Sequence, residues 1–244
     1  MARTIVVSGG GTGIGKAVAA RFASDGDRVV VIGRRSDVLH RAAEEVGGTA
    51  LPADLGDPAQ VERVRDELAE RFGTVDVLVN NAGGNVEIGD GAADGPKDTA
   101  RRWTGNFHAN VLTSVLPTEA LRDLFSPSAR IVFVSSIAAY RGSGGGSYGS
   151  MKAALHPYAY DLAADLGPRG ITVNVVAPGL IDDTEFFGGG LDGERHAALV
   201  AQTSTGRAGT PDDVAETVHW LASPGARHVT AQIVQVNGGA ENGR

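Results

Sequence analysis

Short runs of Val, Ile and Leu recur along the 244 residues, and amphipathic segments fill most of the gaps between them. Several runs consist almost wholly of branched apolar residues, as do parallel strands that are buried on both faces. This alternation predicts an α/β chain with a three-layer, doubly wound parallel sheet of about seven strands and helices on both faces. We expect the strands at Thr4–Val7, Arg28–Ile32, Thr49–Leu51, Val75–Val79, Arg130–Val134, Thr172–Val176 and Gln232–Val236.

Helix signals lie between these strands. Asp57 and Pro58 have the residue types of an N-cap and a first helical position, and Gly26 and Gly73 have the type that ends a helix. No linker-like composition divides the chain, so we expect a single domain over residues 1–244. The helices are expected at 13–24, 58–72, about 100–125, 147–167 and after Thr210-Pro211.

Composition excludes several classes of function. The net charge is −7 and no Lys/Arg-rich run is present, which argues against nucleic-acid binding. The absence of Cys excludes disulfides and thiolate metal sites, and we expect no metal. No apolar run is long enough for a signal-peptide core or a membrane span, so we expect a soluble cytoplasmic protein without a membrane partner.

A glycine-rich turn follows the first predicted strand and precedes the first predicted helix. It reads Ser8-Gly9-Gly10-Gly11-Thr12-Gly13-Ile14-Gly15. Glycines let a backbone turn sharply and approach a pyrophosphate, which the helix N-terminus behind them attracts. Glycine clusters also occur in plain loops, and the spacing Gly-x-x-x-Gly-x-Gly differs from the common dinucleotide fingerprint. The position between strand and helix favours a dinucleotide site that includes Gly9, Gly11, Thr12, Gly13 and Ile14.

The end of the second predicted strand bears on which dinucleotide is bound. An acid commonly stands there to bind the ribose 2′-hydroxyl, whereas this chain has Gly33-Arg34-Arg35. Arginine binds a 2′-phosphate that an acid would repel, so we favour NADP(H) over NAD(H). Alternatively, the arginines are solvated residues at a helix start, a reading that applies to Arg35 in particular.

Tyr148 and Lys152 are four residues apart within a predicted helix, which places both side chains on one face. A nearby ammonium favours the phenolate and would lower the pKa of the tyrosine, making it a proton donor usable near neutral pH. Such a pair also arises by chance, so its meaning depends on the surrounding motifs.

Together these motifs resemble those of the short-chain dehydrogenase/reductase family, with a Rossmann-like fold. The resemblance covers nearly the whole chain and is nearest to reductases of the 3-oxoacyl carrier-protein type. It rests on Gly9/Gly13/Gly15, Asp54, Asn80-Asn81-Ala82-Gly83, Asn110, Ser135-Ser136, Tyr148-x-x-x-Lys152, Pro178-Gly179 and Asn237-Gly238-Gly239.

The resemblance implies a catalytic role for four residues. Tyr148 would exchange a proton with the substrate oxygen, and Ser136 would hydrogen-bond that oxygen. Lys152 would hold the nicotinamide ribose and stabilise the phenolate, and Asn110 would hold a water that relays protons towards Lys152. Strand alternation exposes only one of the paired serines, and the family pattern favours Ser136. Singly, each of these residues could instead have a structural role.

The resemblance also implies further cofactor contacts, with Asp54 at the adenine and Thr184 and the Ile181 backbone at the nicotinamide carboxamide. Two spacings depart from the family pattern: Ser136 and Tyr148 are one residue closer together, and Thr184 lies one residue later after Pro178-Gly179. Thr12 stands where NADP-preferring members sometimes have a basic residue, which weakens the NADP(H) preference. The full cofactor set is Gly9, Gly11, Thr12, Gly13, Ile14, Arg34, Arg35, Asp54, Leu55, Asn81, Ala82, Gly83, Tyr148, Lys152, Pro178, Gly179, Ile181 and Thr184.

Residues 182–203 are expected to form a lid over the substrate. Phe186 and Phe187 could cover an apolar substrate, with Gly188-Gly189-Gly190 as a hinge. Alternatively, the segment is a mobile surface loop whose aromatic residues pack on the domain. With Ser136 and Tyr148, the two phenylalanines make up the expected substrate contacts.

The resemblance implies a homo-oligomer, a tetramer or a dimer, in which the helices around Asn110 and Tyr148 pair across a two-fold axis. Leucines at outer positions of these helices would supply the interface, unless they face the protomer's own sheet. They are Leu112, Leu116, Leu121, Leu155 and Leu162.

The favoured function is NADP(H)-dependent interconversion of a ketone or 3-oxoacyl group, possibly carrier-bound, and a secondary alcohol. An NAD(H)-dependent alcohol dehydrogenase of the same family is one alternative. A catalytically idle nucleotide-binding scaffold or redox sensor is another, although it would need only the glycine turn. An enoyl reductase is disfavoured, because that branch places its Lys farther from the Tyr.

Overall fold

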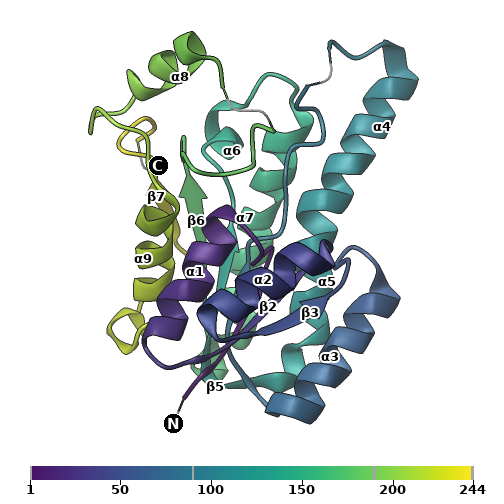
Figure 1. Cartoon of the computed structure of the whole chain (residues 1–244), viewed down its shortest axis with the longest axis vertical. Coiled ribbons are helices and arrows are strands. Elements are labelled where there is room, and N and C mark those ends of the chain that lie inside the picture. Colours follow the sequence, from purple (N-terminus) through teal and green to yellow (C-terminus); the bar gives the residue numbers. More distant parts are fainter. Residues whose placement is uncertain (1, 90, 189–190, 243–244) are drawn as a thin grey trace.

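The computed structural model describes residues 2–89, 91–188 and 191–242, and Figure 1 shows their arrangement. A seven-stranded parallel sheet has the strand order β3-β2-β1-β4-β5-β6-β7. Gly189 and Gly190, part of the expected hinge, lie outside the described residues. The strands are β1 (Thr4–Ser8), β2 (Arg28–Gly33), β3 (Thr49–Pro52), β4 (Val75–Asn80), β5 (Phe125–Val134), β6 (Thr172–Pro178) and β7 (Ile233–Val236).

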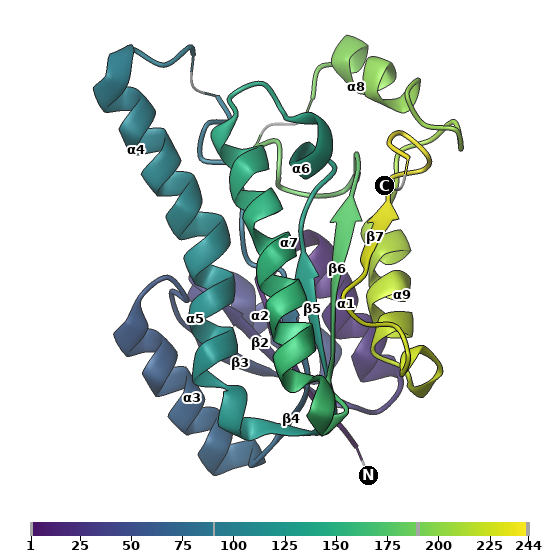
Figure 2. The ribbon, with the colours of Figure 1, turned by 180° about the vertical axis from the view of Figure 1, so that it is seen from behind.

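Helices cover both faces of the sheet, which confirms the predicted three-layer fold. One face packs against α1 (Gly13–Ser24), α2 (Ser36–Val46) and α9 (Pro211–Leu221). The other face, seen in Figure 2, packs against α3 (Pro58–Phe72), α5 (Thr113–Ala120) and α7 (Ser147–Leu166). The remaining helices are α4 (Gly95–Phe107), α6 (Ala138–Arg141) and α8 (Gly193–Val200), of which α8 lies within the expected lid.

The predicted strand positions are confirmed to within a few residues, except at the start of β5. That strand begins at Phe125, five residues before the predicted Arg130, because Phe125 pairs with Val75 of β4. The β4–β5 register then shifts between Val75 and Val77, so the polar Ser-Pro-Ser segment is accommodated by an irregularity. A bulge of this kind leaves no periodic signal in the sequence.

The single helix predicted at about 100–125 is wrong in form. The structure has α4, then a π-helical turn at His108–Leu112, and then α5, which ends at Ala120. The widened turn contains Asn110, whose amide nitrogen donates to the Gly84 carbonyl at 2.8 Å. A contact with another segment thus accompanies the change in helix type, and π-turns of this kind are frequent at functional sites.

The leucines proposed for an oligomer interface mostly face the protomer's own core. Leu121, Leu155 and Leu162 are fully buried in the cluster beneath α7, and Leu116 packs against it. The exposed large apolar residues of these helices are instead Trp103 and Phe107 on α4 and Tyr160 on α7. The oligomer therefore remains a prediction, with a different set of surface residues. Among the described residues, no helix is both long and apolar enough to cross a bilayer.

Candidate active site

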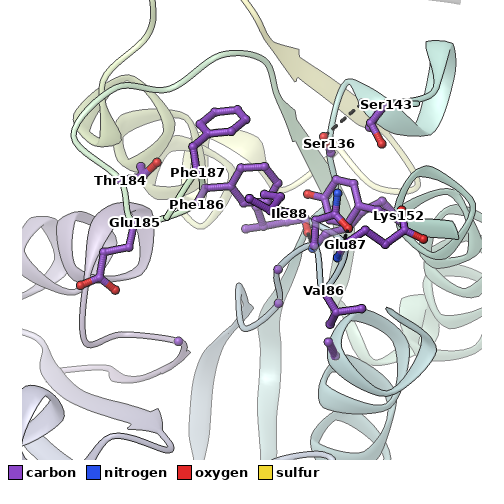
Figure 3. Close-up of a pocket in the computed structure, with 18 of the residues that line it drawn as sticks. Val86, Glu87, Ile88, Ser136, Ser143, Lys152, Thr184, Glu185, Phe186 and Phe187 are labelled. Atoms are coloured by element: carbon purple, nitrogen blue, oxygen red, sulfur yellow. Dashed lines mark hydrogen bonds between the residues drawn. The ribbon is translucent and has the colours of Figure 1, made fainter. Parts of the chain in front are cut away.

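The carboxyl ends of the central strands open onto a cavity of about 1560 Å³, part of which is drawn in Figure 3. Every residue that the sequence assigned to cofactor or substrate lines this cavity. Of the four predicted catalytic residues, Ser136, Tyr148 and Lys152 line it, and Asn110 lies directly behind the wall formed by Ala109. The topology thus brings together segments that are far apart in the sequence. Their roles stay predictions.

The glycine turn has the tight geometry that a phosphate cradle needs. Gly9 has φ +65°, and its N–H donates to the Ile32 carbonyl at 2.7 Å. A Cβ at Gly15 would stand 2.2 Å from the Gly9 carbonyl oxygen, so only glycine permits this approach of helix and turn. Asn81 braces the turn by donating from its side chain to the carbonyls of Ser8 and Gly9. These residues fit a bound dinucleotide pyrophosphate.

The two arginines after β2 have different surroundings. Arg34 is exposed, lines the cavity and makes no hydrogen bond or ion pair with another residue in the described ranges. Arg35 forms a 2.6 Å ion pair with Glu185 of the lid, and the Glu185 carboxylate also accepts from Thr12 at 3.3 Å. This hydrogen-bonded pair raises the pKa of Arg35 and lowers that of Glu185. The Arg35 side chain is nevertheless 58% exposed at the start of α2, so the alternative of a solvated arginine stays open.

Asp54 lies on the cavity wall after β3. Its carboxylate accepts from the Gly56 N–H at 2.9 Å, and its own N–H donates to the Gln60 side chain. The residue thus shapes the turn before α3 and still borders the cavity with Leu55. Its role in this turn is therefore compatible with the predicted contact between Asp54 and the adenine.

Tyr148 and Lys152 lie on the first turns of α7 and are almost completely buried, at 5% and 3% exposure. The Lys152 ammonium donates to the Val134 carbonyl at 2.9 Å and is 6.0 Å from the centre of the Tyr148 ring. Burial lowers the pKa of Lys152 to about 8. Burial also raises the pKa of Tyr148 to about 12, and a hydrogen bond with Ser136 opposes this shift only in part.

The expected lowering of the Tyr148 pKa is therefore wrong for this structure. The spacing correctly places the two side chains on one helix face, but it does not report how far both are removed from water. Desolvation disfavours the phenolate more than the ammonium at this distance favours it. Burial therefore favours the protonated form of Tyr148 in this structure.

The paired serines after β5 have different hydrogen-bond partners. Ser136 is half-buried, lines the cavity and accepts from the Ala138 N–H at 3.1 Å. Ser135 is buried and donates to the Lys152 carbonyl at 3.0 Å, with the His156 ring nitrogen 2.9 Å away. Ser135 thus ties the strand to α7, which leaves Ser136 beside Tyr148. This arrangement agrees with the preference for Ser136.

Asn110 and Lys152 converge on Gly83. A Cβ at Gly83 would stand 2.7 Å from the Asn110 side-chain oxygen and 3.0 Å from the Lys152 nitrogen. Asn110 is fully buried, and its oxygen accepts from the Gly84 N–H at 3.1 Å. The Asn-Ala-Gly motif therefore has a steric reason for its glycine, because a side chain there would separate or displace the two polar groups.

The expected lid lies over the site. The Phe186 ring is 5.5 Å from the Tyr148 ring and 4.9 Å from the Phe187 ring. Thr184 packs on the glycine turn, 3.3 Å from where a Cβ on Gly13 would stand. Figure 3 shows Phe186 and Phe187 between Glu185 on one side of the cavity and Lys152 on the other.

Four residues of this region were missed by the sequence analysis: Glu87, Asn106, Ser147 and Glu185. Ser147 immediately precedes Tyr148, and Asn106 lies one helical turn before Asn110, so their places next to predicted residues were available signals. Glu87 and Glu185 reach their partners only through the fold, since no local pattern links Glu87 to Ser147 or Glu185 to Arg35.

Known proteins similar to this chain were then compared with it. The family model described as "Enoyl-(Acyl carrier protein) reductase" matches residues 9–241. An uncharacterized oxidoreductase of Methylorubrum extorquens is 36% identical over 245 residues, covering 97% of each chain. The 3-oxoacyl-[acyl-carrier-protein] reductase FabG of Escherichia coli is 34% identical over 240 residues, covering 96% of this chain and 95% of its own.

Solved structures agree with these sequence matches. A short-chain dehydrogenase from Burkholderia cenocepacia J2315, in complex with NADP, has a TM-score of 0.87 and 33% identity, covering 98% of this chain and 97% of its own. The family match spans nearly the whole chain, and the fold, the glycine turn and the Ser136–Tyr148–Lys152 cluster agree with it. The chain belongs to the short-chain dehydrogenase/reductase family and is an NAD(P)-dependent oxidoreductase that acts on CH–OH and C=O groups.

Proposed function

We propose that this enzyme is an NADP(H)-dependent reductase that interconverts a ketone or 3-oxoacyl group and a secondary alcohol. The observation that carries the proposal is the buried Tyr148 hydroxyl, which is hydrogen-bonded with Ser136 and lies near the buried Lys152 ammonium. The E. coli relative is a 3-oxoacyl-[acyl-carrier-protein] reductase, which supports a 3-oxoacyl substrate for this enzyme. The apolar Phe186 and Phe187 above the site suit an acyl or other hydrophobic group.

The side chains supply the proton and the electrostatic environment. Ser136 donates a hydrogen bond to the carbonyl oxygen, where negative charge develops during reduction. Tyr148 donates its proton to the same oxygen, because a phenol with a pKa of about 12 is fully protonated at neutral pH. The Lys152 ammonium then stabilises the phenolate that forms. The bound nicotinamide supplies the hydride, and alcohol oxidation reverses these roles.

The preference for NADP(H) rests on Arg34. This arginine is exposed at the cavity edge, and its guanidinium is not engaged by any residue that the structure describes. It is therefore available for charge-assisted hydrogen bonds to a 2′-phosphate. Arg35 is already paired with Glu185, so we assign the 2′-phosphate to Arg34 first. The alternative cofactor is NAD(H), which has no 2′-phosphate for Arg34 to bind.

Two other functions are less well supported. A nucleotide-binding scaffold would not need a lysine buried at a cost in stability beside a tyrosine and a serine. The matching family model is named after an enoyl reductase, yet the four-residue spacing of Tyr148 and Lys152 favours carbonyl chemistry. We also propose a homo-oligomer, in which the exposed Trp103, Phe107 and Tyr160 are covered by a second copy.

The proposed function predicts carbonyl reduction that depends on the Tyr148 hydroxyl. Purified protein with NADPH should reduce members of a panel of ketones and 3-oxoacyl thioesters, followed by loss of nicotinamide absorbance. Tyr148→Phe should lower kcat by about 10²–10⁴-fold, because general acid catalysis by the phenol is lost. NADPH binding, measured by fluorescence, should persist in the variant. Undiminished turnover by Tyr148→Phe would refute the proton-donor assignment.

The assignment of Arg34 predicts a selective effect on nucleotide affinity. Arg34→Ala should weaken NADPH binding by roughly 10–100-fold, the equivalent of lost charge-assisted hydrogen bonds, and leave NADH binding nearly unchanged. Arg35→Ala is the matched control and should change the affinities for both nucleotides to a similar, smaller extent, since its partner is Glu185. Titrations followed by calorimetry would measure all four constants. Equal losses for NADPH and NADH in Arg34→Ala would contradict the assignment.

The buried ammonium predicts a pH-dependent cost in stability. Lys152 has a pKa of about 8 in the folded protein and an ordinary value of 10.5 when unfolded. Between these values the unfolded chain binds more protons, so the contribution of Lys152 to the free energy of unfolding rises with pH. Lys152→Met should therefore be more stable than wild type at pH 7, and its advantage should shrink by about 2 kcal/mol between pH 8 and 10. Urea denaturation at several pH values measures this, and a constant difference would argue against a lowered pKa of Lys152 in the folded protein.

A further inference from the structure

A chain of hydrogen bonds runs from the cavity wall to Asn110; we call it the Glu87 chain. The Ser147 hydroxyl donates to the Glu87 carboxylate at 2.5 Å. The Asn106 amide donates to the Ser147 oxygen at 2.7 Å. The Asn110 amide donates to the Asn106 backbone and side-chain oxygens at 3.0 and 3.3 Å. Four residues from three segments of the sequence are thus connected without a break.

The inner members of the Glu87 chain are fully removed from water. Ser147, Asn106 and Asn110 all have 0% exposure. Asn106 uses both ends of its amide, since its oxygen also accepts from the Val86 N–H and its nitrogen also reaches the Asn85 side chain. Buried polar groups in a saturated network are costly to leave unpaired, so the loss of one member is felt by its neighbours.

The carboxylate at the outer end fixes the direction of these bonds. A Glu87 oxygen accepts from the Ser147 hydroxyl, and the Ser147 oxygen accepts from the Asn106 amide. The Asn106 oxygen is then turned towards the Asn110 nitrogen, which leaves the Asn110 oxygen facing Gly84 and Gly83. That oxygen is the one that converges with the Lys152 nitrogen on Gly83. The acceptor oxygen of Glu87 thus completes the outer end of a network in which the Val86 and Gly84 backbone groups fix the same amide orientations.

The same carboxylate also secures the start of α7. The N-cap of this helix is Gly146, which has no side chain to cap it, and the first turn contains no acid. Glu87 supplies a negative charge there from another segment, which the N-terminus of a helix favours. A Cβ at Gly145 would stand only 1.8 Å from a Glu87 oxygen, so the carboxylate packs against the loop that enters α7. In Figure 3, Glu87 and Lys152 lie on the same side of the cavity.

We propose that Glu87 is a positioning residue that acts through Ser147 and Asn106 to hold Asn110 and Tyr148 in place for proton transfer. The inference rests on the proposed reductase function, since it concerns the geometry of the same site. Ser147 is the residue before Tyr148, and Asn110 faces the Lys152 ammonium, so one carboxylate controls both sides of the proton-transfer group.

The test measures the chemical step with Glu87 altered in two ways. Glu87→Ala removes the acceptor and should lower kcat by about tenfold, with the Kd for NADPH unchanged, because small displacements of catalytic groups slow chemistry. Glu87→Gln keeps an oxygen that can accept from Ser147, and its kcat should recover most of this loss. With NADPH deuterated at the transferred position, the isotope effect on kcat should be larger for Glu87→Ala than for wild type.

Further variants distinguish the loss of the Glu87 connection from misfolding and from indirect effects of the substitution. Gly145→Ala should displace the carboxylate without removing it and should reproduce the Glu87→Ala kinetics. Glu87→Ala and Ser147→Ala should be non-additive in kcat, because both break the same connection. Glu70→Ala, an exposed acid of α3, and Gly167→Ala, at the far end of α7 with open space for a Cβ, are the matched controls and should behave as wild type.

The outcomes separate this inference from the proposed function. If wild-type enzyme reduces no ketone or 3-oxoacyl thioester, the proposed function fails, and amide hydrogen exchange still tests the connection. Glu87→Ala should then raise exchange in residues 84–88 and 147–152 and leave α1 unchanged. If the wild type is active, a normal kcat in Glu87→Ala, no rescue by Glu87→Gln, or unchanged exchange in both segments would each overturn the positioning role.

Discussion

Parallel pairing of β1, β4, β5 and β6 is the constraint on which the site depends. Val7 pairs with Val79, Val79 with Val132 and Val132 with Asn174, so four strands leave the sheet at the same edge. Every segment that follows them must turn within this edge. Ser8 and Pro178 end β1 and β6, and Asn81 and Ser136 follow β4 and β5, although the four residues are spread over most of the sequence. The apolar interior of the sheet thus fixes, through register alone, where the polar groups meet.

Much of this arrangement could be predicted because its signals are local. Runs of branched apolar residues gave the strands, and a glycine cluster between strand and helix gave the nucleotide turn. The spacing of Tyr148 and Lys152 gave a shared helix face. Ser135 and Ser136 both line the cavity, and the choice of Ser136 as the catalytic serine stays a prediction. The structure brings all of these to one cavity. Local periodicity carries this information because each element must bury one face wherever it lies in the fold.

Other features depend on contacts between distant segments and left no local signal. The π-turn at Asn110 accompanies hydrogen bonds to Gly84, and helical periodicity does not report such a partner. The raised pKa of Tyr148 comes from burial, which its spacing from Lys152 cannot reveal. The roles of Glu87 and Glu185 likewise require the fold, because their partners Ser147 and Arg35 are far away in the sequence. Leu121, Leu155 and Leu162 have apolar side chains whose direction, inward or outward, is decided only by packing.

The contact between Phe186 and Tyr148 links the packing of residues 182–203 to the pKa of the Tyr148 hydroxyl. The phenol owes its raised pKa to exclusion of water, and Phe186 of the lid is one of the groups that lies against its ring. Exclusion of water from this ring disfavours the phenolate, so the packing of residues 182–203 against Tyr148 bears directly on the acid strength of its hydroxyl.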